Sequence, residues 1–192
     1  MSQFTFNLEN KPALGRSDFI VSESNLDAIK WIDNWPNWSH NSSGLNVVGP
    51  KSSGKTHLGS VWCSLSKAEW VNAPITDGMR VLDILKNGQH IVLDNFNHTW
   101  PGVPLLHLYN LVRERKGFIL IISNIPVAQL GITPNDLASR LSTIPVVAIK
   151  APDDFLLKEV MLKLFKDRQI AVENEVVDYL VLRMERSFEE AL

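Results

Sequence analysis

Residues 49–56 read Gly49-Pro50-Lys51-Ser52-Ser53-Gly54-Lys55-Thr56 and match G-x-x-x-x-G-K-[ST], the pattern of the phosphate-binding P-loop. The preceding residues 45–48 are mostly apolar and end in two β-branched valines, which predicts a buried strand. Residues 56–68 contain few helix breakers and predict a helix. Strand, loop and helix in this order turn backbone N–H groups and a helix N-terminus toward phosphates. We therefore predict a nucleotide site, in which Lys55 reaches the outer phosphates and the Thr56 hydroxyl helps to hold Mg²⁺.

The bulk properties of the chain set the class of protein. Its 192 residues suffice for one α/β domain with a small appendage, and a hydrophobic content of 45% can fill a sizeable core. The net charge of -2 argues against sequence-specific DNA binding, because phosphate contacts need clustered Lys and Arg. The single cysteine, Cys63, excludes a disulfide framework and is expected to be an inert buried thiol of a cytoplasmic protein. No apolar run approaches the roughly 20 residues of a membrane span.

Further apolar segments alternate with helical patterns along the chain, which predicts an α/β fold with a parallel sheet flanked by helices. The strands expected beside the first are 70–72, 90–94, 118–123 and 146–149, and the expected helices are 25–34, 76–86, 104–115 and a short one from 134. Ser24 and Thr76 are the expected helix caps. After Pro152, helices are expected over 153–168 and 173–186, and they would form a small lid. The last of these helices can still be running where the sequence ends, so the lid can be incomplete. The expected division is 1–18 as an N-terminal peptide and linker, 19–150 as the α/β domain and 151–192 as the lid.

Two polar residues follow predicted strands and belong to the expected site. Asp94 ends an apolar strand downstream of the P-loop, where a Walker B carboxylate organises the Mg²⁺ shell. Asn124 follows the next strand and could touch the γ-phosphate or position water, although an ordinary turn explains it as well. Trp31, Trp35 and Trp38 are expected in core packing rather than in a ligand platform.

Residues 3–8 alternate between apolar and polar side chains, in the order Gln3-Phe4-Thr5-Phe6-Asn7-Leu8. By composition alone this pattern favours a short edge strand packed on its own domain. The alternative is an extended peptide that docks on another protein, with Phe6 and Leu8 as anchors in pockets and Gln3 as a hydrogen-bonding end.

Several of these segments together resemble the DnaA branch of the AAA+ proteins, from about residue 3 to the end of the chain. The P-loop continues into His57-Leu58, as is typical of that branch, and 19–25 is similar to the segment that opens its nucleotide-binding domain. Residues 137–141 are similar to the segment that carries its arginine finger, which would be Arg140. The resemblance implies an AAA+ domain with a five-stranded parallel sheet and a helical lid. In such a domain residues 49–57, Asp94 and Asn124 would contact ADP or ATP, with Mg²⁺ held through Thr56 and Asp94.

Within that branch the chain resembles the Hda group, the regulatory inactivators of DnaA. The sequence has no room for a C-terminal helix-turn-helix, and its start is similar to the clamp-binding hexapeptide of the group. The Trp-rich residues 31–38 and the segment 184–187 look like alphaproteobacterial members. The resemblance reverses the preference for an edge strand. It implies docking on the DNA-loaded sliding clamp of DNA polymerase III, in the cytoplasm at the replisome, through four residues: Gln3, Phe4, Phe6 and Leu8.

The implied activity is the stimulation of ATP hydrolysis in a partner, DnaA, by insertion of Arg140 as an arginine finger. Two departures indicate that the chain hydrolyses ATP poorly by itself. Asn95 stands where many AAA+ ATPases have a second acidic residue, and an amide is not a general base. Glu189 aligns with the sensor 2 arginine, or Arg186 does if the register shifts by one turn. Glu189 at this position would weaken contact with the γ-phosphate and favour ADP.

Two alternative functions and one question of assembly stay open at this point. The chain could be an autonomous P-loop ATPase or a helicase loader similar to the DnaC group. It could also be a nucleotide-free adaptor with a vestigial P-loop, against which the intact Lys55 and Thr56 argue. Whether it forms a homodimer is not decided by the sequence.

Overall fold

The computed structural model describes residues 15–38, 42–75, 80–86 and 88–191. Its centre is a five-stranded sheet in the order β2-β3-β4-β1-β5, and every neighbouring pair of strands is parallel. This confirms the predicted fold class. The strands are β1 (Gly44–Val48), β2 (Glu69–Val71), β3 (Ile91–Phe96), β4 (Ile119–Ser123) and β5 (Val146–Ala148).

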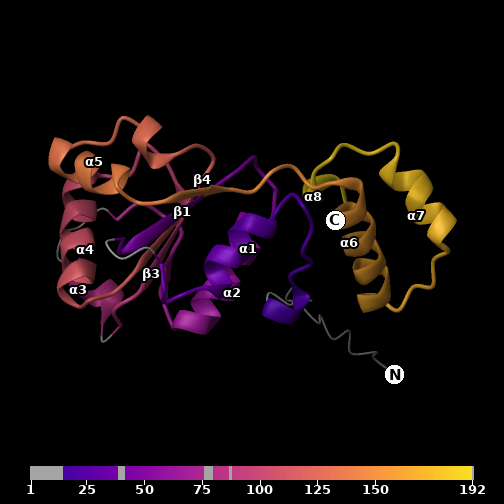
Figure 1. The fold of residues 1–192 in the computed structure, drawn as a ribbon, viewed down its shortest axis with the longest axis horizontal. Helices are drawn as coiled ribbons and strands as arrows, with labels where there is room; N and C mark the ends of the chain where they lie inside the picture. Colours follow the sequence, from indigo (N-terminus) through magenta and orange to yellow (C-terminus); the bar gives the residue numbers. More distant parts are fainter. Residues whose placement is uncertain (1–14, 39–41, 76–79, 87, 192) are drawn as a thin grey trace, which may run out of the picture.

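Helices cover both faces of the sheet (Figure 1). Successive strand residues point to opposite faces, so Ile91 and Leu93 join the apolar core on one side while Val92 joins the core on the other. Burial on both faces explains why these strands are almost continuously apolar. The first core includes α3 (Arg80–Leu85), α4 (Gly102–Glu114) and α5 (Asn135–Ser142), and the second includes α1 (Leu26–Asp33) and α2 (Lys55–Ser66).

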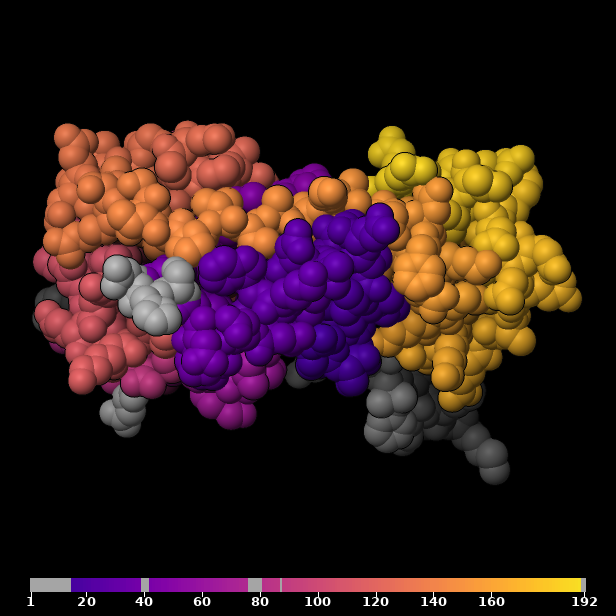
Figure 2. Space-filling model, in the orientation of Figure 1, coloured from indigo at the N-terminus to yellow at the C-terminus, as the bar shows by residue number. Residues whose placement is uncertain are grey.

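The C-terminal helices pack around a smaller apolar cluster of their own, at the right of Figures 1 and 2. They are α6 (Asp154–Asp167), α7 (Asn174–Val181) and α8 (Phe188–Ala191), and we keep the name lid for these three helices. The Asp153 carboxylate caps α6 by accepting a hydrogen bond of 2.8 Å from the Leu156 N–H. In Figure 2 the segment that follows residue 15, coloured indigo, lies between the α/β body and the lid. A 3₁₀ turn in that segment, η1 (Arg16–Asp18), is tied to the lid by the ion pair of Asp18 and Lys163.

Several expected boundaries were wrong. Helix α7 ends at Val181 instead of near residue 186, and α8 restarts the helical path at Phe188. Asn25, not Ser24, precedes α1, and its side chain shapes the incoming loop by accepting from the Ser22 N–H and donating to a carbonyl. The cap expected at Thr76 lies outside the described residues.

Trp31, Trp35 and Trp38 take part in core packing, as expected: Trp38 is buried, and Trp31 and Trp35 are partly buried against the same cluster. Trp38 is buried and stacks on Trp62 with a centroid distance of 5.5 Å, and its indole N–H donates to the Trp31 carbonyl. Cys63 is half-buried, its thiol donates to the Ala68 carbonyl, and burial raises its pKa. Among the helices of the described ranges, none combines the length and apolar character needed to cross a membrane.

Candidate functional site

The P-loop leaves the end of β1 and enters α2 at Lys55, as the motif predicts. Its two glycines serve different purposes. A Cβ atom at Gly49 would lie 2.3 Å from the Ile149 carbonyl oxygen, so the loop passes β5 too closely for any side chain. Gly54 has a φ of +92°, a left-handed conformation that glycine adopts without strain. Both glycines are therefore required by the backbone conformation of the P-loop.

A cavity of about 530 Å³ opens beside this loop. Its walls come from residues 51–56, from 94–97 at the end of β3, from 122–124 at the end of β4 and from Phe188 of the lid. Ligands of open parallel sheets bind at the carboxyl ends of the strands, which is where this cavity lies. Its volume is in the range of ordinary small-ligand sites.

The polar groups of the loop fit a phosphate ligand. The Ser53 hydroxyl is buried and has no hydrogen-bond partner in the part of the chain that the structure describes, although Ser53 lines the cavity. A buried hydroxyl without a partner costs about 1–3 kcal/mol, so a ligand oxygen would stabilise it. Lys55 is buried, and its Nζ donates to the carbonyls of Gly49 (2.8 Å) and Pro50 (2.5 Å). Burial lowers the pKa of Lys55, while the charge of Asp94 acts in the opposite direction.

Thr56 and Asp94 come together as the sequence predicts. The Thr56 hydroxyl lies 3.2 Å from Oδ2 and 3.4 Å from Oδ1 of Asp94, across the cavity floor. Hydroxyl and carboxylate oxygens are hard ligands of the kind that Mg²⁺ binds together with nucleotide phosphates. These two side chains would hold the ion, which would neutralise phosphate charge.

Asn95 and Asn124 both line the cavity. Asn95 sits in a bulge of β3 with a φ of +54°, which asparagine tolerates better than most residues, and its N–H donates to Asp94. The backbone conformation therefore gives a structural reason for an asparagine at position 95, in addition to the weak ATP hydrolysis that the sequence suggested. His57, in contrast, is not among the residues that line the cavity: its ring packs edge-on against Phe19, on the N-terminal segment.

Sequence reasoning missed one residue that shapes the cavity, Asn46. This side chain is fully buried in β1; it donates to the Ile121 carbonyl (3.1 Å) and to the Ser123 hydroxyl (2.9 Å). Its carbonyl accepts the Val127 N–H at 3.0 Å. The three bonds hold the chain as it leaves β4, where Ser123 lines the cavity. The sequence did contain a signal for this role, because Asn46 is a single amide side chain within an otherwise apolar predicted strand.

The two candidates for the sensor 2 position occupy different places. The Arg186 guanidinium pairs with Asp154 at the start of α6, at 3.0 Å from Nε to Oδ1. The Glu189 carboxylate contacts the P-loop itself, accepting from Lys51 Nζ at 3.1 Å and from the Ser52 hydroxyl at 3.2 Å. These hydrogen bonds lower the pKa of Glu189. Of the two, the acidic residue lies at the phosphate-binding loop.

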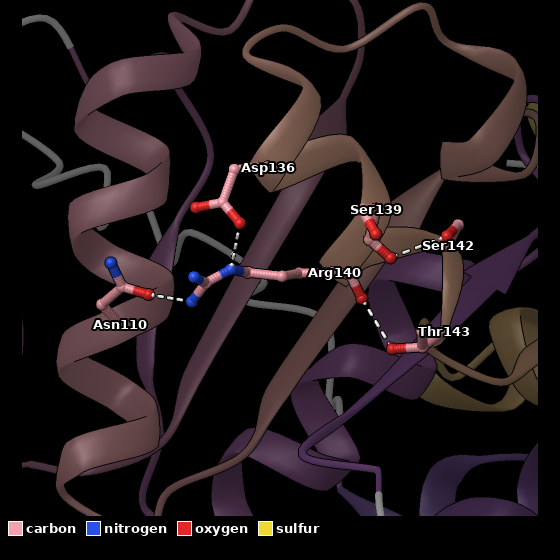
Figure 3. A network of polar contacts seen from close by, with 6 residues as sticks. All are labelled: Asn110, Asp136, Ser139, Arg140, Ser142 and Thr143. Atoms are coloured by element: carbon pink, nitrogen blue, oxygen red, sulfur yellow. Dashed lines mark hydrogen bonds and ion pairs between the residues drawn. The ribbon is translucent and has the colours of Figure 1, made fainter.

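Arg140 lies on α5 and is not among the residues that line the P-loop cavity. Figure 3 shows its side chain held between two helices: Nε donates to Asp136 (2.9 Å) and Nη1 to Asn110 of α4 (2.5 Å). Neither bond uses Nη2, and the side chain is 41% exposed. The arrangement presents a pre-oriented cation at the surface. The peptide of Gln3, Phe4, Phe6 and Leu8 lies outside the described residues.

No protein-family model and no curated protein sequence matches this chain. Solved structures match its fold. Domain III of the replication initiation protein DnaA from Thermotoga maritima aligns with a TM-score of 0.72 at 16% identity, over 94% of this chain and 85% of that one. AMPPCP-bound DnaA from Aquifex aeolicus gives a TM-score of 0.70 at 18% identity, over 91% and 61%. A RuvB variant from Thermotoga maritima gives a TM-score of 0.70 at 14% identity, over 93% and 61%.

These matches show that the chain shares its fold with DnaA domain III, as the sequence resemblance implied. RuvB has the same fold, so the fold alone does not show whether the chain is more similar in function to DnaA or to RuvB. The chain spans 61% of the length of the Aquifex DnaA chain. Identities below one fifth show the fold and leave the activity to the site residues.

Proposed function

We propose that this protein is a nucleotide-bound regulator of replication initiation of the Hda type, which binds the DNA-loaded sliding clamp and stimulates ATP hydrolysis by DnaA. In this role it is an activator rather than an efficient ATPase. The proposed effect on replication initiation is negative, because ATP hydrolysis by DnaA ends the ATP-bound state of DnaA. The single observation that carries it is the position of Arg140: exposed, pre-oriented and outside the chain's own P-loop cavity.

Nucleotide binding is supported by the cavity and by the polar side chains that line it. The Lys55 ammonium group, the Thr56 hydroxyl and the Asp94 carboxylate meet there, and the buried Ser53 hydroxyl gains a partner if phosphate binds. We assign ADP with Mg²⁺ as the resident ligand, because the Glu189 carboxylate at the loop repels the additional charge of a γ-phosphate.

Arg140 would act in trans. A guanidinium beside a transferring phosphoryl group stabilises the charge that develops in the transition state, an effect worth roughly 10³–10⁵ in rate. Because Nε and Nη1 are fixed by Asp136 and Asn110, the group enters the partner's site already oriented. Little side-chain entropy is then lost on contact.

The test of this role is DnaA-dependent ATP hydrolysis with Arg140→Ala. We expect stimulation to be lost while clamp binding is retained. Arg113→Ala is the matched control, because this arginine is also exposed and also donates to a side-chain oxygen, that of Ser43. Full stimulation by Arg140→Ala would show that another arginine is the finger.

Clamp docking is assigned to Gln3, Phe4, Phe6 and Leu8, on the resemblance of the peptide to clamp-binding hexapeptides. The double variant Gln3→Ala with Leu8→Ala should lose clamp affinity and keep nucleotide affinity, since neither residue belongs to the P-loop motif of residues 49–56. Clamp affinity unchanged in this variant would remove the docking assignment.

An autonomous ATPase, or a helicase loader similar to the DnaC group, is the second candidate. The paired Thr56 and Asp94 favour it, because a complete Mg²⁺ site is what hydrolysis requires. Steady-state turnover by the purified protein separates the two functions. Brisk hydrolysis without DnaA and clamp would support the second candidate.

A further inference from the structure

The C-terminal strap, which we define as Ser187, Phe188 and Glu189, lies against the P-loop at the mouth of the cavity. The Phe188 N–H donates to the Ser52 carbonyl at 3.2 Å. The two carboxylate oxygens of Glu189 accept from Lys51 Nζ and from the Ser52 hydroxyl. The strap thus binds Ser52 through both its main chain and the Glu189 side chain, and it binds Lys51 through Glu189.

The Phe188 ring adds an apolar contact to these polar ones. A Cβ atom at Gly54 would lie 3.3 Å from the ring, and the ring lines the same cavity as Lys55 and Thr56. Phe188 is half-buried because its other side packs on the apolar cluster of the lid, which includes Met161. The ring therefore joins the lid to the phosphate-binding loop.

The chemistry of the strap is that of the loop's expected ligand. A P-loop binds anionic oxygens through its N–H groups, its hydroxyls and its lysines. Glu189 supplies two anionic oxygens to one lysine and one hydroxyl of that loop, and the hydrogen bond and charge of Lys51 lower the pKa of this carboxylate. A nucleotide that enters the cavity brings further negative charge to the same place.

We propose that the strap is an internal competitor of the nucleotide: Glu189 and Phe188 occupy the mouth of the phosphate site, and nucleotide binding releases them from the loop. This inference rests on the proposed nucleotide binding. Because Phe188 also packs in the lid, its release changes the position of α8 relative to the loop. Occupancy of the site is thereby transmitted to the C-terminal end of the lid.

The first test is the affinity for Mg-ADP, measured by isothermal titration calorimetry on the full chain. Glu189→Gln keeps the size of the side chain and removes its charge, so we expect roughly twofold to fivefold tighter binding, as suits an exposed charge. Glu190→Gln is the matched control, because Glu190 is an exposed neighbour whose N–H bonds to Ser187 within the strap. The gain should shrink at high ionic strength.

The second test is hydrogen exchange at the Phe188 amide, which the Ser52 carbonyl protects in the described structure. Competition predicts faster exchange at this amide when Mg-ADP is added. Slower exchange, or binding by Glu189→Gln that is equal to or weaker than that of Glu190→Gln, would overturn the proposal, since the strap would then close over the nucleotide. Failure of every variant to bind Mg-ADP would instead refute nucleotide binding itself.

Discussion

Replacing Asn46 by alanine tests how the end of β4 is held beside the cavity. The substitution removes the acceptor of the buried Val127 N–H and the donors to Ile121 and Ser123. One unsatisfied buried donor costs about 1–3 kcal/mol. The lost side-chain volume at a fully buried site adds to this, so we expect a loss of about 3 kcal/mol in the free energy of unfolding.

The assay is urea and thermal unfolding of Asn46→Ala beside Asn34→Ala. Asn34 is exposed and makes one side-chain hydrogen bond, to the Asn37 carbonyl, so its replacement should change stability by less than about 0.5 kcal/mol. For a chain of this size, about 3 kcal/mol corresponds to a fall in Tm of roughly 6–12 °C. If Asn46→Ala lost no more than about 1 kcal/mol, the argument that this amide holds the β4 end would be refuted.

Two further predictions concern the loop and the pH dependence of stability. Gly49→Ala should abolish measurable Mg-ADP binding, because its Cβ would collide with the Ile149 carbonyl. Gly131→Ala strains a backbone with a φ of +63° but meets no atom within 4 Å, so it should lose some stability and bind normally; calorimetry checks both. His90 accepts the Phe118 N–H at Nδ1, and burial lowers its pKa below 6.5, so its contribution to stability is present above pH 6.5 and is lost as the pH falls through the folded pKa. Urea unfolding at pH 7.5 and 5.5 should show a smaller acid loss for His90→Asn than for the wild type; an equal loss would contradict this.

The local features of the sequence predicted the body of the fold. The P-loop, the apolar strands and the Asp94 carboxylate are set by residues close together in the chain, and the parallel sheet follows from alternating strands and helices. The pairing of Thr56 with Asp94 could be anticipated, because the P-loop that leads into Thr56 follows β1 and Asp94 lies near the end of β3 in the same parallel sheet.

What the sequence left undetermined depends on contacts between distant segments. The contact of Glu189 with Lys51 joins residues 138 positions apart, and nothing in the local pattern near the C-terminus indicates it. The end of α7 was likewise missed, since no glycine or proline marks it and the helical pattern continues past Val181. The support of Arg140 by Asn110 required the packing of α4 on α5, which periodicity alone does not place.

The glutamate at the loop also connects the two proposals. An anion held beside Lys51 opposes the charge of a triphosphate more than that of a diphosphate, which supports ADP as the resident ligand. The same contact makes the lid sensitive to occupancy.

The most direct test of the proposed function is the rate of ATP hydrolysis by DnaA in the presence of this protein, with and without sliding clamp loaded on DNA. We predict that hydrolysis accelerates only when loaded clamp is present and that the protein alone turns over ATP slowly. An unchanged rate of DnaA hydrolysis with loaded clamp would contradict the account.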